Sequence, residues 1–199
     1  MQRIDYFKIY EKLYRLGYHA RLKNHGQKYV KTIVLKYKFK SILEIGCSNG
    51  IAVKKFKKSR KLSYGIDVSD IATRYAAEKV LVPNCIISSA TDIPFKDKFV
   101  EAAFSCDCLE HLYPEDVPKA IREIVRVTSK YIFAVLDFET ERNREYLDKA
   151  KKEWPEDFKN IDNLHLTIWD KGQWIKAFSR CGAKYIMSHD DLMVFTVEN

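Results

Sequence analysis

Two groups of residues in this sequence have side-chain types and spacings that are typical of ligand-binding or catalytic sites. The first is the run Glu44-Ile45-Gly46-Cys47-Ser48-Asn49-Gly50, where an apolar strand enters a glycine-punctuated turn ahead of a helix. Such a turn brings helix N-terminal amides close to a ligand. Asp67 ends the next apolar run, 67 − 46 = 21 residues after Gly46, where a carboxylate can reach ribose hydroxyls. The pair predicts a nucleotide-type site.

The second group follows a later apolar run and reads Cys106-Asp107-Cys108-Leu109-Glu110-His111-Leu112. Asp107, Glu110 and His111 stand at positions i, i+3 and i+4, so a helical segment would place them on one face. Side chains of this kind can remove a proton from a reacting group or bind a divalent ion. Glu110 and His111 could equally have a purely structural role.

The glycine turn fits two classes of nucleotide site. A dinucleotide site needs a third glycine for close helix packing, and Val53 stands near that place, which argues against a pyrophosphate in the loop. The pattern Glu44-x-Gly46-x-x-x-Gly50 resembles instead the first motif of class I S-adenosylmethionine-dependent methyltransferases. The resemblance continues in order through residues 64–69, 90–95 and 99–112, and it covers roughly residues 41–137.

This resemblance implies the cofactor S-adenosylmethionine and a role for each matching residue. Asp67 would hold both ribose hydroxyls, Val68 would pack on the adenine, and Asp92 would accept from the adenine amino group. Ser48 departs from the family pattern, because many members have a second glycine there. The implied cofactor-binding set is Glu44, Gly46, Cys47, Ser48, Gly50, Asp67, Val68, Thr91, Asp92, Ile93 and Cys106.

The second group is similar to the acidic-x-x-Glu-His motif of two metal-assisted families, the ubiquinone-pathway O-methyltransferases and the small-RNA 2′-O-methyltransferases. In those families a downstream histidine completes the site, and His165 is the counterpart here. The resemblance therefore implies Mg²⁺ or Mn²⁺ held by Asp107, Glu110, His111 and His165. Other methyltransferases with the same Leu-Glu-His-Leu text are not known for a metal, so His111, His165 and Asp107 could act without one.

Alternating apolar runs and amphipathic segments must position these groups, and they are typical of a parallel sheet with crossover helices. We therefore expect a doubly wound α/β fold, with seven mostly parallel strands, an antiparallel last strand and helices on both faces. Expected strands are residues 41–45, 63–66, 85–87, 100–105, 131–136, 184–188 and 192–197. Expected helices are residues 51–60, 70–79, 115–127 and 171–180.

The chain of 199 residues is predicted to be one methyltransferase domain with four parts. They are an N-terminal helical cap (1–40), a cofactor-binding core (41–137), an acceptor-side insertion (138–170), and a last helix with a C-terminal hairpin (171–199). In the first part, Tyr6, Tyr10, Tyr14 and Tyr18 recur every four residues and share one helix face. That face either packs against the sheet edge or covers the cleft.

The amino-acid composition indicates the cellular location of the protein and the charge of its methyl acceptor. No apolar run approaches the roughly 18 residues that span a bilayer, and the start of the chain lacks the apolar stretch of a secretion signal, so we expect a cytoplasmic protein without a membrane partner. Thirty-five Lys and Arg against 27 acidic residues give a net charge of +8, which favours an anionic acceptor such as a nucleotide-linked sugar or RNA.

We expect O-methylation of a hydroxyl on a small molecule, a glycan or a nucleotide-sugar precursor. Three alternatives stay open: 2′-O-methylation of RNA with a divalent metal, N-methylation, and a catalytically silent cofactor-binding module that regulates a partner. The intact Glu44, Gly46, Asp67 and Asp92 argue against loss of cofactor binding, but they do not predict turnover.

Overall fold

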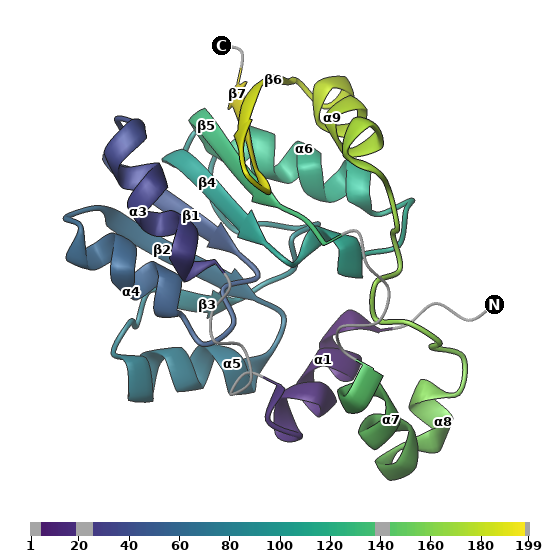
Figure 1. Cartoon of the computed structure of the whole chain (residues 1–199). Helices are drawn as coiled ribbons and strands as arrows, with labels where there is room; N and C mark the ends of the chain where they lie inside the picture. The colour runs from purple at the N-terminus through teal and green to yellow at the C-terminus, as the bar shows by residue number, and fades with distance from the viewer. Residues whose placement is uncertain (1–4, 19–25, 138–143, 198–199) are drawn as a thin grey trace.

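A single twisted sheet is the centre of the molecule (Figure 1). The computed structural model describes residues 5–18, 26–137 and 144–197, and every structural statement below concerns these residues. The seven strands lie in the order β3-β2-β1-β4-β5-β7-β6, with β7 antiparallel to both neighbours and the others parallel. The expected fold class is confirmed. The strands are β1 (Ser41–Ile45), β2 (Leu62–Asp67), β3 (Cys85–Ile87), β4 (Val100–Cys106), β5 (Thr128–Val135), β6 (Ala183–His189) and β7 (Leu192–Val197).

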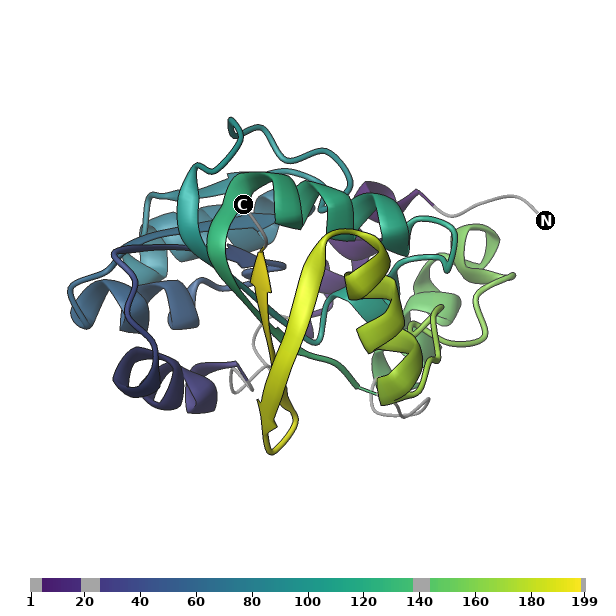
Figure 2. The same cartoon turned by 90° about the horizontal axis from the view of Figure 1, so that it is seen from above.

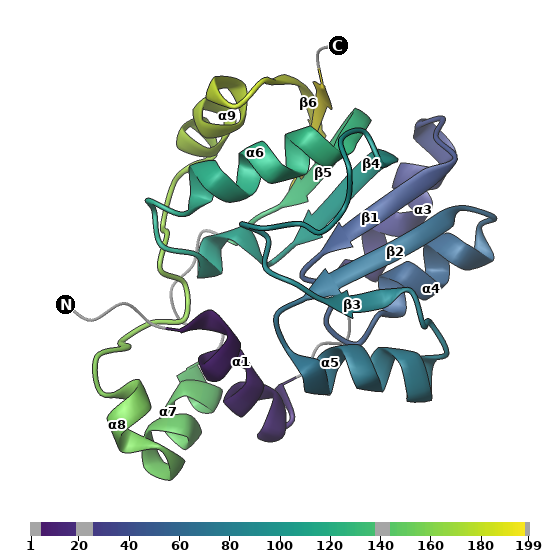
Figure 3. The same cartoon turned by 180° about the vertical axis from the view of Figure 1, so that it is seen from behind.

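Helices cover both faces of this sheet. On one face lie α3 (Gln27–Lys36) and α4 (Ile51–Lys58), and on the other lie α6 (Val117–Val127) and α9 (Lys171–Arg180), as Figures 2 and 3 show from above and behind. Beside α4, α5 (Asp70–Tyr75) runs directly into the π-helical turn η1 (Ala76–Val80). The expected helix over 70–79 is thus present, but its second half is wound more widely.

Each face buries its own apolar core. The stripe Val117, Ala120, Ile121, Ile124 and Val127 recurs at helical spacing along α6 and packs on the sheet together with aromatic residues of α9. On the opposite face, Phe56 of α4 packs edge-to-face on Phe104 of β4, with ring centroids 5.8 Å apart. These two layers fix the strands whose carboxyl ends carry the polar residues.

A third cluster forms a separate helical cap, made of α1 (Tyr6–Arg15), α7 (Arg144–Glu153) and α8 (Pro155–Phe158) (Figure 1). Leu13 and Phe158 are fully buried in it, and the Asp157 carboxylate of α8 binds both Lys8 and Lys12 of α1. The tyrosine face of α1 therefore belongs to a cap and does not pack against a sheet edge. The expected insertion supplies α7 and α8, although its first residues, 138–143, lie outside the described residues.

The cap is tied to the sheet domain at two places. Tyr6 donates to the Asp116 carboxylate at 2.9 Å and accepts from the Tyr113 backbone N–H at 2.7 Å. At the other end of α1, Ser69 donates its hydroxyl proton to Glu11 at 2.8 Å. These contacts hold α1 across the carboxyl ends of the strands. In the described part of the chain, no helix is both long enough and apolar enough to cross a bilayer.

Candidate active-site pocket

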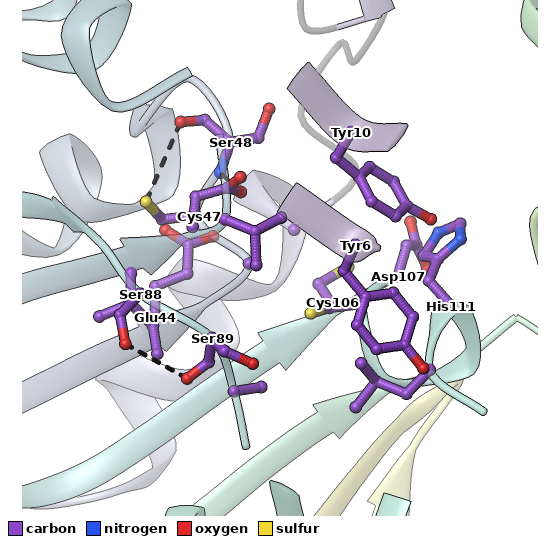
Figure 4. A pocket seen from close by; sticks show the side chains of 18 of the residues that line it. Tyr6, Tyr10, Glu44, Cys47, Ser48, Ser88, Ser89, Cys106, Asp107 and His111 are labelled. Carbon is purple, nitrogen blue, oxygen red and sulfur yellow. Dashed lines mark hydrogen bonds between the residues drawn. The ribbon is translucent and has the colours of Figure 1, made fainter. Parts of the chain in front are cut away.

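A pocket of about 320 Å³ lies between the cap and the carboxyl ends of β1, β2 and β4. In open α/β sheets this edge, where the strand order reverses, is the usual ligand site. Figure 4 shows two sides. We call the loops after β1, β2 and β3 (residues 44–48, 67–68 and 88–90) the glycine-turn side. The other side, named the histidine side, contains Tyr6, Tyr10, Asp107, His111 and His165.

On the glycine-turn side, two buried carboxylates hold the loop after β1. Glu44 Oε2 accepts from the Val53 backbone N–H at 3.1 Å, which ties the strand end to the first turn of α4. Burial raises the pKa of Glu44 above its ordinary value. Asp67 Oδ2 accepts from the Ser48 backbone N–H at 2.9 Å, so the ends of β1 and β2 are joined at the pocket wall.

Asp67 also meets the cap. Its Oδ1 accepts from the Ser69 backbone N–H at 3.0 Å, and the Tyr14 hydroxyl donates to Oδ2 at 3.4 Å. Burial raises the pKa of Asp67 to about 6, although hydrogen bonds from three backbone amides and Tyr14 favour the ionised form. Asp67 is thus a mostly ionised acceptor at neutral pH, lining the pocket where a diol could replace the long contact to Tyr14.

The two glycines of the turn have mainly packing roles. A Cβ on Gly46 would lie 2.5 Å from Cys108 Sγ, and a Cβ on Gly50 would lie 2.6 Å from Val82 Cγ2. Both have φ +70°, which favours glycine. Gly46 lines the pocket, whereas Gly50 does not. Ser48, between them, has φ +48° without being a glycine, a strained conformation of the kind found at functional sites.

The loop after β3 contributes residues other than those expected. Ser88, Ser89 and Ala90 line the pocket, whereas Thr91, Asp92 and Ile93 do not. Asp92 is exposed beside a separate surface hollow. The loop is held there by α6, because Ile93 donates its backbone N–H to Glu123 at 2.9 Å and its carbonyl accepts from Arg126. Of the remaining residues expected to bind the cofactor, Cys47 and Val68 line the pocket on this side, and Cys106 lines it at the end of β4.

On the histidine side, the two expected histidines meet although they are 54 residues apart. The His111 and His165 rings lie edge-to-face with centroids 4.8 Å apart, and the Tyr10 ring packs on His111 at 5.6 Å. Both histidines are buried and line the pocket together with Asp107. His111 ends the short 3₁₀ turn η2 (Leu109–His111), which directs its ring towards the cap.

The state of His111 follows from its contacts. Its Nδ1 lies 2.9 Å from the Leu164 carbonyl, which can only accept, so Nδ1 carries the proton and Nε2 retains the lone pair. Burial, assisted by neighbouring His165, lowers the pKa of His111 to about 4. His111 is therefore neutral at pH 7 and can accept a proton at Nε2.

Glu110 plays a different part from its neighbours. It is fully buried, does not line the pocket, and its Oε1 accepts from the Asp137 backbone N–H at 2.9 Å. Burial, followed by the nearby Asp107 charge, raises the pKa of Glu110 to about 8, so it is largely protonated at neutral pH. It joins the loops after β4 and β5.

The four residues predicted to bind a metal do not all point to one position. Asp107, His111 and His165 line the pocket. Glu110, however, accepts from the Asp137 backbone N–H, and the Nδ1 of His111 is hydrogen-bonded to the Leu164 carbonyl. Among the described residues, no three His, Cys, Asp or Glu side chains are grouped so that they could hold a metal ion. The metal hypothesis receives no support from this geometry.

Some pocket residues were left undecided or were missed by the sequence reasoning. Tyr6, Tyr10, Tyr14 and Tyr18 all line the pocket, as does Asp137. The four-residue tyrosine spacing left two options, packing against the sheet edge or covering the cleft, and it could not decide between them. Asp137 follows the apolar end of β5, and a polar residue at the carboxyl end of a parallel strand was the signal that could have identified it.

The family model that matches this chain covers part of the sheet and not the cap. Residues 43–131 match a protein family described as a methyltransferase domain. This range runs from β1 into β5 and includes the glycine turn, Asp67 and His111. No curated protein matches the chain in sequence.

Solved structures share the fold over almost the whole length. Magnesium protoporphyrin IX methyltransferase from Synechocystis PCC 6803, with bound S-adenosylmethionine, superposes with a TM-score of 0.68 at 14% identity, covering 100% of both chains. A methyltransferase from Haloferax volcanii, in complex with the activator Trm112, gives 0.66 at 16% identity, covering 92% of this chain and 95% of that one. A TehB-like methyltransferase from Corynebacterium glutamicum gives 0.62 at 14% identity, covering 96% and 98%. At these identities the likeness shows the fold alone.

Proposed function

We propose that this enzyme, an S-adenosylmethionine-dependent methyltransferase, methylates a hydroxyl group of a small molecule or a glycan, including a nucleotide-sugar precursor. The observation that carries the choice of a hydroxyl is His111, a neutral imidazole in the pocket whose Nε2 is the nitrogen able to accept a proton. An alcohol must lose its proton during methylation, and a positioned base assists that loss.

The glycine-turn side fits the cofactor. A buried, mostly ionised carboxylate at Asp67 suits a ribose diol, since each carboxylate oxygen can accept more than one hydrogen bond. Glu44, Gly46, Cys47 and Ser48 would flank the methionine part, with Cys106 opposite and Val68 beside the adenine. Next to the adenine, Ser89 and Ala90 are better placed than Asp92. The cofactor supplies an electrophilic methyl group, whose bond to sulfur breaks as its bond to the acceptor oxygen forms.

The histidine side would bind and orient the acceptor. Its wall is largely aromatic, with Tyr6 and Tyr10 on α1 facing His111 (Figure 4). Holding the hydroxyl in line with the methyl group supplies most of the catalysis expected for such a displacement. The hydroxyl proton would pass to His111 Nε2, and His165, in ring contact with His111, would position that imidazole.

Methyl-transfer assays with labelled S-adenosylmethionine test the proposal. The acceptor panel should contain phenols, sugars, nucleotide-sugars, amines and short RNA. We expect an O-methylated product, a loss of about 100-fold or more in turnover for His111→Ala, and unchanged cofactor affinity by calorimetry. His189→Ala, which removes a histidine in the β6–β7 hairpin away from the pocket, is the matched control and should leave turnover unchanged.

Each of the other possible assay results would support one of the alternative functions. Methylation of amines only would replace the hydroxyl by a nitrogen acceptor, and full activity of a folded His111→Ala variant would move the base elsewhere. Tight cofactor binding without any methylated product across the panel would favour the catalytically silent module. If chelator abolished turnover and Mg²⁺ or Mn²⁺ restored it, the metal-assisted mechanism would return despite the side-chain geometry.

A further inference from the structure

The surface formed by α3, α4 and the residues that join them to the sheet is strongly basic. This basic face, residues 26–62, contains one acidic residue, Glu44, which is buried. The rest of the chain has 35 − 11 = 24 basic and 27 − 1 = 26 acidic residues, so the entire net charge of +8 arises from this segment. Its eleven basic residues are Lys28, Lys31, Lys36, Lys38, Lys40, Lys54, Lys55, Lys57, Lys58, Arg60 and Lys61.

The orientation of α3 and α4 places these charged side chains on one side of the molecule. The apolar residues of α3 and α4 pack into the same core against the sheet, opposite α6 and α9 (Figures 1 and 3). Their lysines consequently point outward, and nine of the eleven basic side chains are exposed, Lys54 and Lys61 being half-buried.

The side-chain cations of the basic face form no ion pairs in the described structure. None of the eleven pairs with a described carboxylate, whereas several lysines elsewhere do, as in Lys130 with Glu101 and Lys149 with Glu145. The Lys61 ammonium donates to the Phe39 carbonyl at 2.6 Å, and the Lys40 backbone N–H donates to the Glu101 carboxylate at 3.0 Å. Unpaired like charges repel one another, and a bound polyanion would relieve that repulsion.

We infer that the basic face binds the phosphodiester backbone of a nucleic acid. The ten residues of α3 extend about 15 Å, which matches four or five phosphates of one strand at about 3.4 Å each. A membrane surface is a poorer partner, because in the basic face only Leu35 and Leu62 are exposed large apolar side chains. Gly26, directly before α3, is buried and lines the pocket, so the basic face and the pocket share this residue.

This binding activity goes beyond the proposed methyl transfer and does not depend on which molecule accepts the methyl group. The nucleic acid is either the carrier of the acceptor hydroxyl or a separate ligand.

The test is fluorescence anisotropy with a labelled RNA of about 20 nucleotides and the DNA of the same sequence, at salt from about 50 to 200 mM. The variant Lys55→Gln/Lys57→Gln/Lys58→Gln removes three charges of α4. The matched control, Lys171→Gln/Lys176→Gln/Arg180→Gln, removes three exposed charges of α9 on the opposite face. Because each phosphate contact contributes about 0.7 to the salt slope of a single strand, the α4 variant should lower the slope by about 2 and weaken binding at least about 10-fold.

Several results would overturn the inference: equal losses in the α4 and α9 variants, no binding of either polynucleotide at the lowest salt, or binding of phosphatidylserine vesicles in place of RNA and DNA. A preference between RNA and DNA would identify the source of the phosphodiester. Calorimetry with S-adenosylmethionine should give the wild-type affinity for both variants, which keeps this result separate from the proposed methyl transfer.

Discussion

The two sides of the pocket are built in different ways. The glycine-turn side is formed by short loops directly after β1, β2 and β3, and Asp67 meets Ser48 and Ser69 through backbone amides. The histidine side is assembled from segments far apart in the chain, since His111 contacts Tyr10 of α1 and His165 of the insertion. Local loop geometry therefore positions the glycine-turn side, which Tyr14 of the cap also contacts at Asp67, while packing of the cap positions the histidine side.

The largest expected effect comes from the cap. Phe158 is fully buried among residues of α1 and α7, and Phe158→Ala should destabilise this cluster by about 3 kcal/mol or more. Urea unfolding would measure the change, and turnover would fall because Tyr10 leaves His111. Affinity for the cofactor, which rests on the sheet loops, should drop much less. An equal loss of cofactor affinity would show that the two sides are one cooperative unit.

Next in size is the effect expected from the proposed contact of Asp67 with the ribose. Asp67→Ala removes the carboxylate that lines the pocket, and cofactor affinity should fall about 100-fold by calorimetry, since hydrogen bonds to charged groups contribute about 1.5–3 kcal/mol each. Asp92→Ala is the matched control, because that carboxylate is exposed outside the pocket. If Asp92→Ala weakened binding as strongly, the loop after β3 would have to turn inward when the cofactor binds.

Burial raises the pKa of carboxyl groups near both sides of the pocket, Glu44 and Asp67 at the glycine-turn side and Glu110 next to the histidine side. Glu110 has its pKa raised to about 8 in the folded protein against an ordinary value of 4.5, so the folded state binds more protons and stability is lost as pH rises through 4.5 to 8. Glu110→Gln keeps the shape without the charge and should flatten that fall, which is on the order of a few kcal/mol. Unfolding free energies at pH 5 and 8 measure it. An unchanged pH dependence would mean that Glu110 stays ionised.

The smallest effect is expected in the glycine turn itself. Ser48 has φ +48°, a conformation that a glycine adopts without steric cost, so Ser48→Gly should leave stability unchanged or raise it by up to about 1 kcal/mol. Thermal unfolding checks this, with cofactor affinity preserved. A clear loss of stability would indicate that the buried serine side chain is needed where it stands.

The amino-acid sequence by itself determined the sheet and much of the glycine-turn side. The bounds of β1, β3 and β7 agree with the expected residues, and Asp67 ends β2 as its apolar run indicated. These features are local, because a strand and the turn after it lie within a few residues. The bounds of β5 were less predictable, since it begins at the polar Thr128 immediately after α6, where no apolar pattern marks a strand.

Only the tertiary structure decided the roles of Asp92, Glu110 and the tyrosine face. Asp92 is turned out of the pocket because α6 holds the neighbouring Ile93, 30 residues from Glu123. The Glu110 side chain accepts from the Asp137 backbone N–H, and Tyr10 of α1 packs on His111 about a hundred residues away. Such partners are selected by packing between segments, and the sequence of one segment does not identify the segment that packs on it. The ends of the strands could therefore be read from local patterns, whereas tertiary packing decided which side chains meet there.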